Sequence, residues 1–203
     1  MLILVPVLIG LTALTLLLMV GFGDGTRSRT QTRTAADAAA LAAAQEWSHE
    51  VERLYQQVVE QRPGWPETLL TLLSPDAPLT IAGQVRPQAQ SGAQSFAARN
   101  GSTLTGFAQS VTTTGIQWQV STRSVDAAKV SDVHANATAV AGVTLLDGLC
   151  YLSGGTRLGL VVDDACLDPW AGNPPATVPT SLPPTIPQPF RPAALQIRAE
   201  LVQ

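Results

Sequence analysis

Two cysteines, Cys150 and Cys166, are the residues of this sequence whose chemistry is easiest to anticipate. Two thiolates alone do not complete a tetrahedral zinc site, and the two histidines, His49 and His134, are too few and too scattered to add to them. In an exported protein this pair predicts one disulfide, whose loop closure would contribute about 3 kcal/mol of stability. Two buried free thiols are the alternative.

Other residues that could bind an ion or a phosphate form patterns that favour structural roles. Asp163, Asp164 and Asp168 carry oxygens that suit calcium, but their spacing fits no calcium loop, and surface turns are rich in aspartate. Gly154-Gly155 lacks the Lys-Ser/Thr ending of a phosphate loop, so we predict a hairpin turn there.

Neither histidine lies beside a nucleophile motif of the kind a hydrolase needs. We therefore predict a protein that is not an enzyme, with no catalytic residue, no cofactor and no metal site. Nucleic acid is also excluded as a partner, because the net charge is −3 and the chain has a single lysine, Lys129.

The elements around these residues begin with an apolar N-terminal segment. No charged side chain occurs from Met1 to Gly23, a length that spans a hydrocarbon core of about 30 Å as a helix. A signal peptide is the rival, but the apolar run is too long for one and no basic region precedes it. We predict a retained transmembrane helix over 1–24.

Arg27, Arg29 and Arg33 follow this segment, and the positive-inside rule would place the rest of the chain in the cytoplasm. The cysteine pair and the proline-rich tail indicate the outside instead. A basic leader that is removed, or that lies upstream of Met1, would reconcile the two. Gly21, Gly23 and Gly25 predict a bend where the helix leaves the bilayer.

A stalk helix over 25–62 should continue outward from the membrane, because eight of the ten residues of 35–44 are alanine, the best helix former. Pro63 predicts its end. A stripe at heptad-like spacing must pack against the protein's own outer domain or, alternatively, against neighbouring subunits. Its members are Ala40, Ala44, Trp47, Val51, Leu54 and Val58.

An apolar helix followed by Arg27 or Arg29, then Gln31, Arg33 and the run AADAAALA at 35–42, resembles the TadE/TadG-like proteins of tight-adherence (Flp) pilus systems. The run at 96–101, before a Thr/Val-rich stretch, is also similar. This resemblance implies a minor pilin, pseudopilin or assembly component. Processed pilins usually carry glutamate at the fifth mature position, where this chain has Val5, so it is more similar to the unprocessed TadG-like branch or to a subunit assembled by another contact.

Beyond the stalk, the prolines of 63–92 predict a connector with one short helix at Glu67–Leu73, and 89–99 predicts a second helix that Asn100-Gly101 stops. An outer sheet domain over 93–170 should hold strands from Thr103 onward. Alternating or β-branched residues predict strands around Ile116–Val120, at Val133–Val143 and at Thr156–Val162.

The sequence of the chain end predicts a proline-rich arm, 171–192, and a C-terminal strand, 193–203. The alternation over 195–201 favours a strand added to the protein's own sheet. Donation to the sheet edge of another subunit is the alternative.

The predicted fold class is α+β: a long N-terminal transmembrane and stalk helix, then a small sheet domain with one disulfide, pilin-like in layout. The expected function is that of a structural subunit or assembly component of a Tad/Flp-type pilus or a related secretion machine; the alternative is a monomeric membrane-anchored binding module. Expected partners are membrane lipid, other pilin subunits and the assembly machinery, with the C-terminal domain outside a single-pass anchor or in an extracellular filament. The expected assembly helix presents Leu4, Leu8, Leu11, Leu18, Ala40, Ala44, Trp47, Val51, Leu54 and Val58.

Overall fold

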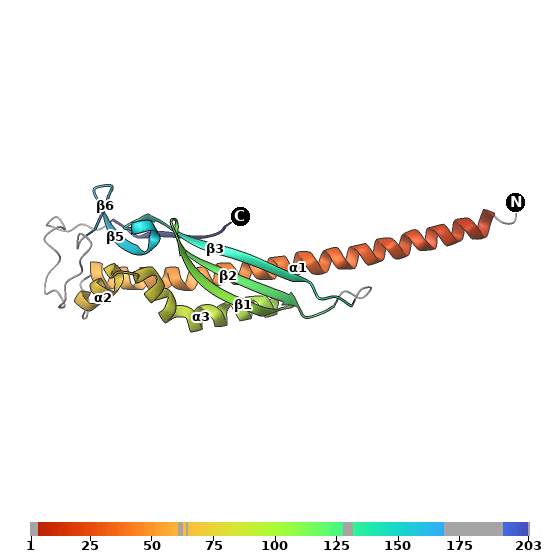
Figure 1. Cartoon of the computed structure of the whole chain (residues 1–203), viewed down its shortest axis with the longest axis horizontal. Coiled ribbons are helices and arrows are strands. Elements are labelled where there is room, and N and C mark those ends of the chain that lie inside the picture. Colours follow the sequence, from red (N-terminus) through yellow and green to blue (C-terminus); the bar gives the residue numbers. More distant parts are fainter. Residues whose placement is uncertain (1–3, 61–62, 64, 128–131, 169–192, 203) are drawn as a thin grey trace.

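The computed structural model describes residues 4–60, 63, 65–127, 132–168 and 193–202, with the side chains of 4–25 and of Trp65 excepted. A helix of 56 residues, α1 (Leu4–Val59), runs the length of the molecule. Its last half is covered by all the other elements, which together form the body (Figure 1). Residues 4–31 of α1, called the rod below, extend away from that body.

The helix α1 continues through Gly21, Gly23 and Gly25, so the predicted bend does not interrupt it. Glycine lowers helix propensity by about 1 kcal/mol, but it keeps its backbone N–H and leaves the hydrogen-bond ladder intact. The helix ends at Val59, three residues before the predicted end at 62. At 1.5 Å per residue α1 is about 84 Å long, of which the rod takes about 42 Å.

Two further helices follow, α2 (Trp65–Leu73) and α3 (Ala77–Arg99). The short helix predicted at 67–73 is confirmed, whereas the second is longer than the predicted 89–99, because it begins at Ala77 and contains Pro87. Proline removes one backbone donor from a helix. Pro87 lies on the exposed face, where water can satisfy the carbonyl that loses its partner. Much of the predicted connector, 63–92, is therefore helical.

The helix α3 ends as predicted, at Arg99, with Asn100 as its cap and Gly101 at a φ of 65°. Four antiparallel strands then form the main sheet, in the order β1-β2-β3-β7. Their bounds are β1 (Ser102–Thr112), β2 (Gly115–Ser124), β3 (Asn136–Asp147) and β7 (Gln196–Leu201).

The predicted strand around Ile116–Val120 is confirmed within β2. The strand predicted at Val133–Val143 begins later, because Asp132 adopts a left-handed φ of 50° and Val133 lies before the ladder. The C-terminal strand β7 pairs antiparallel with β3 of the same chain, with Ala199 opposite Val143, which is the first of the two predicted alternatives. The predicted arm, 171–192, lies outside the described residues.

A second, three-stranded sheet lies at the end of the body farthest from the rod (Figure 1). Its order is β4-β5-β6, from β4 (Leu149–Leu152), β5 (Arg157–Val162) and β6 (Ala165–Leu167). The predicted hairpin turn at Gly154-Gly155 connects β4 to β5 as part of a short 3-10 turn, and the strand predicted at 156–162 is β5. The α+β fold class is confirmed.

Candidate functional site: the long helix and its supporting domain

The covered half of α1 is the centre of the core. It contacts α3 along one side and β2, β3 and β7 along another, with α2 near its end. The six predicted stripe residues are all buried, from 0% exposed for Ala40, Ala44, Trp47 and Val51 to 6% for Leu54. The stripe therefore packs within the chain, the first of its two predicted alternatives.

Small side chains allow the close packing of α1 on α3. Ala36, Ala39 and Ala43 of α1 are fully buried. A matching row of fully buried alanines on α3 consists of Ala82, Ala89, Ala93 and Ala97. Sequence reasoning missed this second row, although its spacing of four over the last three members was a helical signal.

Polar bonds fix α1 at three levels of the body. The hydroxyl of Thr122 in β2 donates to the carbonyl of Thr32 over 3.1 Å, where the rod meets the body. In the middle, the indole Nε1–H of Trp47 donates to the carbonyl of Pro78 over 3.1 Å. Such bonds between elements remote in sequence set the axial position of the helix, which apolar contacts alone allow to slide.

At the far end, the hydroxyl of Tyr55 donates to the carbonyl of Ala193 over 2.8 Å and holds the segment that enters β7. Burial raises the pKa of Tyr55 to about 12, and the negative charge of Asp147 acts in the same direction. Tyr151 donates to the carbonyl of Val143 over 3.0 Å, and its burial also raises its pKa. Both phenols therefore stay neutral donors.

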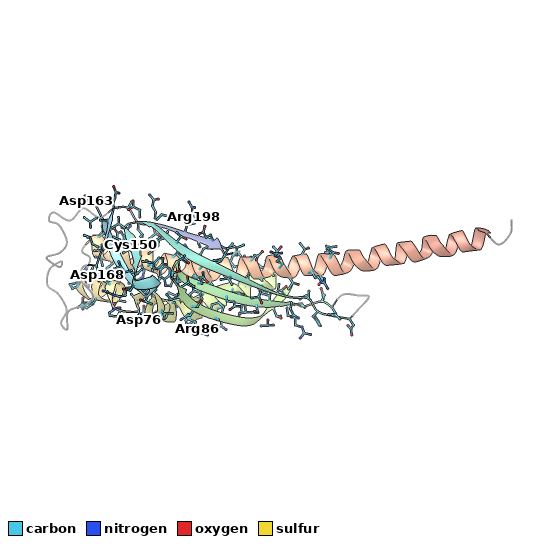
Figure 2. The ribbon with its side chains drawn as sticks, turned by 45° about the horizontal axis from the view of Figure 1, so that its top comes forward. Asp76, Arg86, Cys150, Asp163, Asp168 and Arg198 are labelled. Atoms are coloured by element: carbon cyan, nitrogen blue, oxygen red, sulfur yellow. A yellow bond between two sulfur atoms is a disulfide. The ribbon has the colours of Figure 1, made fainter. Side chains whose placement is uncertain are left out.

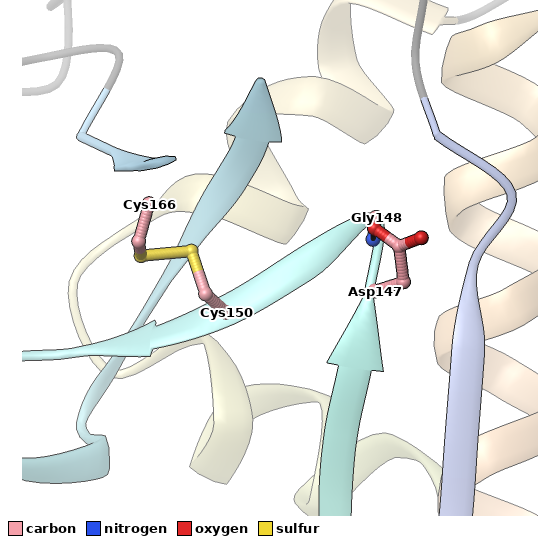
Figure 3. The surroundings of a disulfide bond; sticks show 4 residues. All are labelled: Asp147, Gly148, Cys150 and Cys166. Carbon is pink, nitrogen blue, oxygen red and sulfur yellow. Dashed lines mark hydrogen bonds between the residues drawn. A yellow bond between two sulfur atoms is a disulfide. The ribbon is translucent and has the colours of Figure 1, made fainter. Parts of the chain in front are cut away.

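Cys150 of β4 and Cys166 of β6 form the predicted disulfide, with a Cα–Cα distance of 5.9 Å (Figure 3). It links the two outer strands of the small sheet. A Cβ on Gly159, in the strand between them, would lie 2.5 Å from the carbonyl oxygen of Leu167, so only glycine permits this approach. The disulfide therefore cross-links the small sheet at the end of the body farthest from the rod.

The chain changes direction at Gly148, between β3 and β4 (Figure 3). Gly148 has a φ of 77°, and a Cβ there would lie 2.9 Å from the Cα of Leu195. Its N–H donates to the carboxylate of Asp147 over 2.7 Å. Glycine is thus required both by the backbone angle and by the C-terminal segment that passes beside it.

The aspartates considered for calcium lie at this same end, where Figure 2 labels Asp163 and Asp168. Asp163 and Asp164 form the turn between β5 and β6, with left-handed φ values of 49° and 62°. Asp168 forms an ion pair with Arg157 at 2.8 Å. In the described part of the chain, no group of three His, Cys, Asp or Glu side chains is arranged to hold a metal ion.

The two histidines lie on different elements. His134 bonds through Nδ1 to the carbonyl of Ser124 over 2.8 Å, near the start of β3. His49 lies on the exposed face of α1, in an open groove of about 530 Å³ between α1 and β7. The groove also contains Glu52 and Arg198. The one hydroxyl or thiol in its lining is that of Ser48, which donates to the carbonyl of Ala44 over 3.0 Å on the same helix.

The leucines predicted for assembly, Leu4, Leu8, Leu11 and Leu18, lie in the helical rod, but their side chains are outside the described set. Among the side chains that are described, no helix offers a stretch both long and apolar enough to cross a membrane. The predicted span, 1–24, falls outside those side chains.

Residues 1–46 match the model of a protein family described as putative Flp pilus-assembly TadE/G-like. The match includes the resemblance noted at 27–42 and does not extend to the one at 96–101. No curated protein and no solved structure gives a significant match to the chain. The match spans the rod and the first covered turns of α1, so the N-terminal part of the chain is similar to a TadE/G-like Flp pilus-assembly domain.

Proposed function

We propose that this protein is a structural subunit of the minor-pilin or pseudopilin kind in a Tad/Flp-type pilus or a related secretion machine. The observation that carries the proposal is the helix α1, in which a rod of about 42 Å precedes a half that is locked into a folded body. The rod lies within the family match, 1–46, and it contains most of the uncharged sequence of 1–23.

The division of α1 supports separate roles for its two halves. The stripe of the covered half is buried in the core of its own chain, so it offers no surface to other subunits. We therefore assign assembly through α1 to the rod, whose leucines include Leu4, Leu8, Leu11 and Leu18. The uncharged part of the rod, 4–23, is about 30 Å long as a helix, which matches the thickness of a bilayer core, and it can be buried among lipids before assembly or among sister rods afterwards.

A substitution pair tests the proposal in the bacterium that carries the gene. Leu11→Arg places a charge in the middle of the apolar rod, whereas Leu79→Arg makes the same change at a leucine of α3 that is already 37% exposed. We expect the wild-type chain and Leu79→Arg to co-purify with the membrane and with sheared filaments or the assembly machine. Leu11→Arg should be lost from both, because a charge at the centre of a membrane helix is strongly unfavourable.

Two outcomes contradict the proposal. Normal recovery of Leu11→Arg in both fractions would show that the rod is not buried. A wild-type chain that stays monomeric in the membrane, with filaments unaffected by deletion of the gene, would favour a membrane-anchored binding module instead.

A further inference from the structure

Exposed arginines gather at the end of the body that adjoins the rod. We call the region where the rod meets the body the collar. It comprises α1 residues 26–34, which are the end of the rod and the first covered residues, with the α3–β1 junction at 99–101 and the segments 122–126 and 132–136 around the ends of β2 and β3. Its five arginines outnumber its two aspartates, Asp126 and Asp132, so the described part of the collar carries a net charge of +3 in a chain whose net charge is −3. The arginines are Arg27, Arg29, Arg33, Arg99 and Arg123.

None of these five arginines pairs with a carboxylate among the described residues. Arg99 donates to Ser95 and lies over the ring of Phe96 at 4.4 Å, contacts that leave its charge uncompensated. Unpaired guanidinium groups that share one end of a molecule favour phosphate oxygens as partners, because the planar group binds two oxygens at once.

The collar also exposes apolar side chains. Val133 is 62% exposed and Val125 is 55% exposed, more than any other large hydrophobic residue whose side chain is described. They flank the connection between β2 and β3, and the N–H of Val125 donates to the carbonyl of Gly101 over 2.9 Å, which fixes its position. Apolar residues beside cations are typical of surfaces that enter the headgroup layer of a membrane.

The bond between Thr122 and Thr32 gives the level of the collar along α1. From Thr122 the strand β2 runs toward the rod (Figure 1), and three residues at about 3.3 Å each place Val125 up to about 10 Å farther along. That distance corresponds to about seven residues of α1. Val125 therefore lies near the level of residues 25–31, within about 10 Å of the predicted end of the span at 24, a depth comparable with the headgroup layer.

We propose that the collar docks on the anionic headgroups of the bilayer in which the rod is anchored, with the arginines on lipid phosphates and Val125 and Val133 at the interface. This inference rests on the proposed function, because it requires the rod to be in a membrane. It accounts for the arginines that follow the span on the outer side. It also implies that the body rests on the membrane until the subunit is drawn into an assembly.

The test uses the full chain in liposomes of phosphatidylcholine, alone or mixed with phosphatidylglycerol, that contain a headgroup nitroxide lipid. A fluorophore at Val133→Cys reports contact with the surface, and the same label at Leu79→Cys, on α3 near the other end of the body, is the matched control. We expect the label at 133 to be quenched several-fold more than the label at 79 when phosphatidylglycerol is present. The double variant Arg99→Gln/Arg123→Gln and added salt should each reduce that difference at least twofold.

Flotation of the same liposomes after an alkaline wash separates the two proposals. Failure to float refutes the anchor on which the proposed function rests. Flotation with equal quenching at both labels refutes docking alone. Quenching at 133 that ignores phosphatidylglycerol but rises with the number of chains per liposome would also overturn lipid docking, in favour of contact with a second copy.

Discussion

Replacing Trp47 distinguishes a core role for the α1 stripe from a role between subunits. Trp47 is fully buried, and its indole donates to the carbonyl of Pro78 at the start of α3. Trp47→Ala removes a large side chain at a cost of about 3–5 kcal/mol, and loss of the hydrogen bond adds about 1 kcal/mol. The sum is a large part of the stability of about 5–15 kcal/mol that is usual for a domain.

Urea unfolding of the full chain in detergent, followed by tryptophan fluorescence, measures this loss. With a slope of about 2 kcal/mol per molar urea, Trp47→Ala should lower the midpoint by about 2–3 M. Trp47→Phe keeps most of the apolar contact and should cost less than half as much. Glu52→Ala, at an exposed position of the same helix, is the control and should change the midpoint little.

An unchanged midpoint for Trp47→Ala would refute the reasoning. If the midpoint were unchanged and association between subunits were lost, the stripe would be a contact between subunits rather than part of the core that stabilises the body.

Three further predictions concern the far end of the body. The pKa of Tyr55 in the folded protein, about 12, exceeds the ordinary value of 10.0, so the contribution of Tyr55 to stability is complete below pH 10 and is lost as the pH rises toward 12. Tyr55→Phe should cost about 1 kcal/mol near neutrality, and its difference from wild type in urea unfolding should shrink above pH 10. A difference that stays constant with pH would contradict the assignment. The double variant Cys150→Ser/Cys166→Ser should lose about 3 kcal/mol in urea unfolding, and reduction of the wild-type disulfide should reproduce that loss; reduced wild type with an unchanged midpoint would argue against a stabilising bond. Gly159→Ala should cost about 1–3 kcal/mol by thermal or urea unfolding, because the new Cβ would meet the β6 backbone. Gly92→Ala on α3 is the control and should be neutral or stabilising, because a Cβ there has nothing within 4 Å. Equal effects of the two substitutions would refute the packing argument.

The sequence alone determined the features that depend on local chemistry. The alanine run and the spacing from Ala40 to Val58 specified a long helix with one buried stripe, because helix propensity and period act between near neighbours. A disulfide within the chain could join only Cys150 and Cys166, because the chain has no other cysteine. The alternation before Val202 indicated a strand for the same local reason.

Only the tertiary structure decided which surface each pattern contacts. A stripe such as Trp47 to Val58 looks the same whether α3 or another subunit covers it, and its burial depends on where α3 lies. The early start of α3 was hidden because Pro87 normally ends a helix, and its tolerance depends on an exposed position.

Contacts between residues remote in sequence carry no local signal at all. The bond from Thr122 to Thr32 joins residues 90 positions apart, and that from Tyr55 to Ala193 joins residues 138 apart. The first of these sets how far the body lies from the predicted membrane surface, and thus where the collar arginines are. Sequence could specify the rod and the body, but their relative position arises from packing that exists only after the chain has folded.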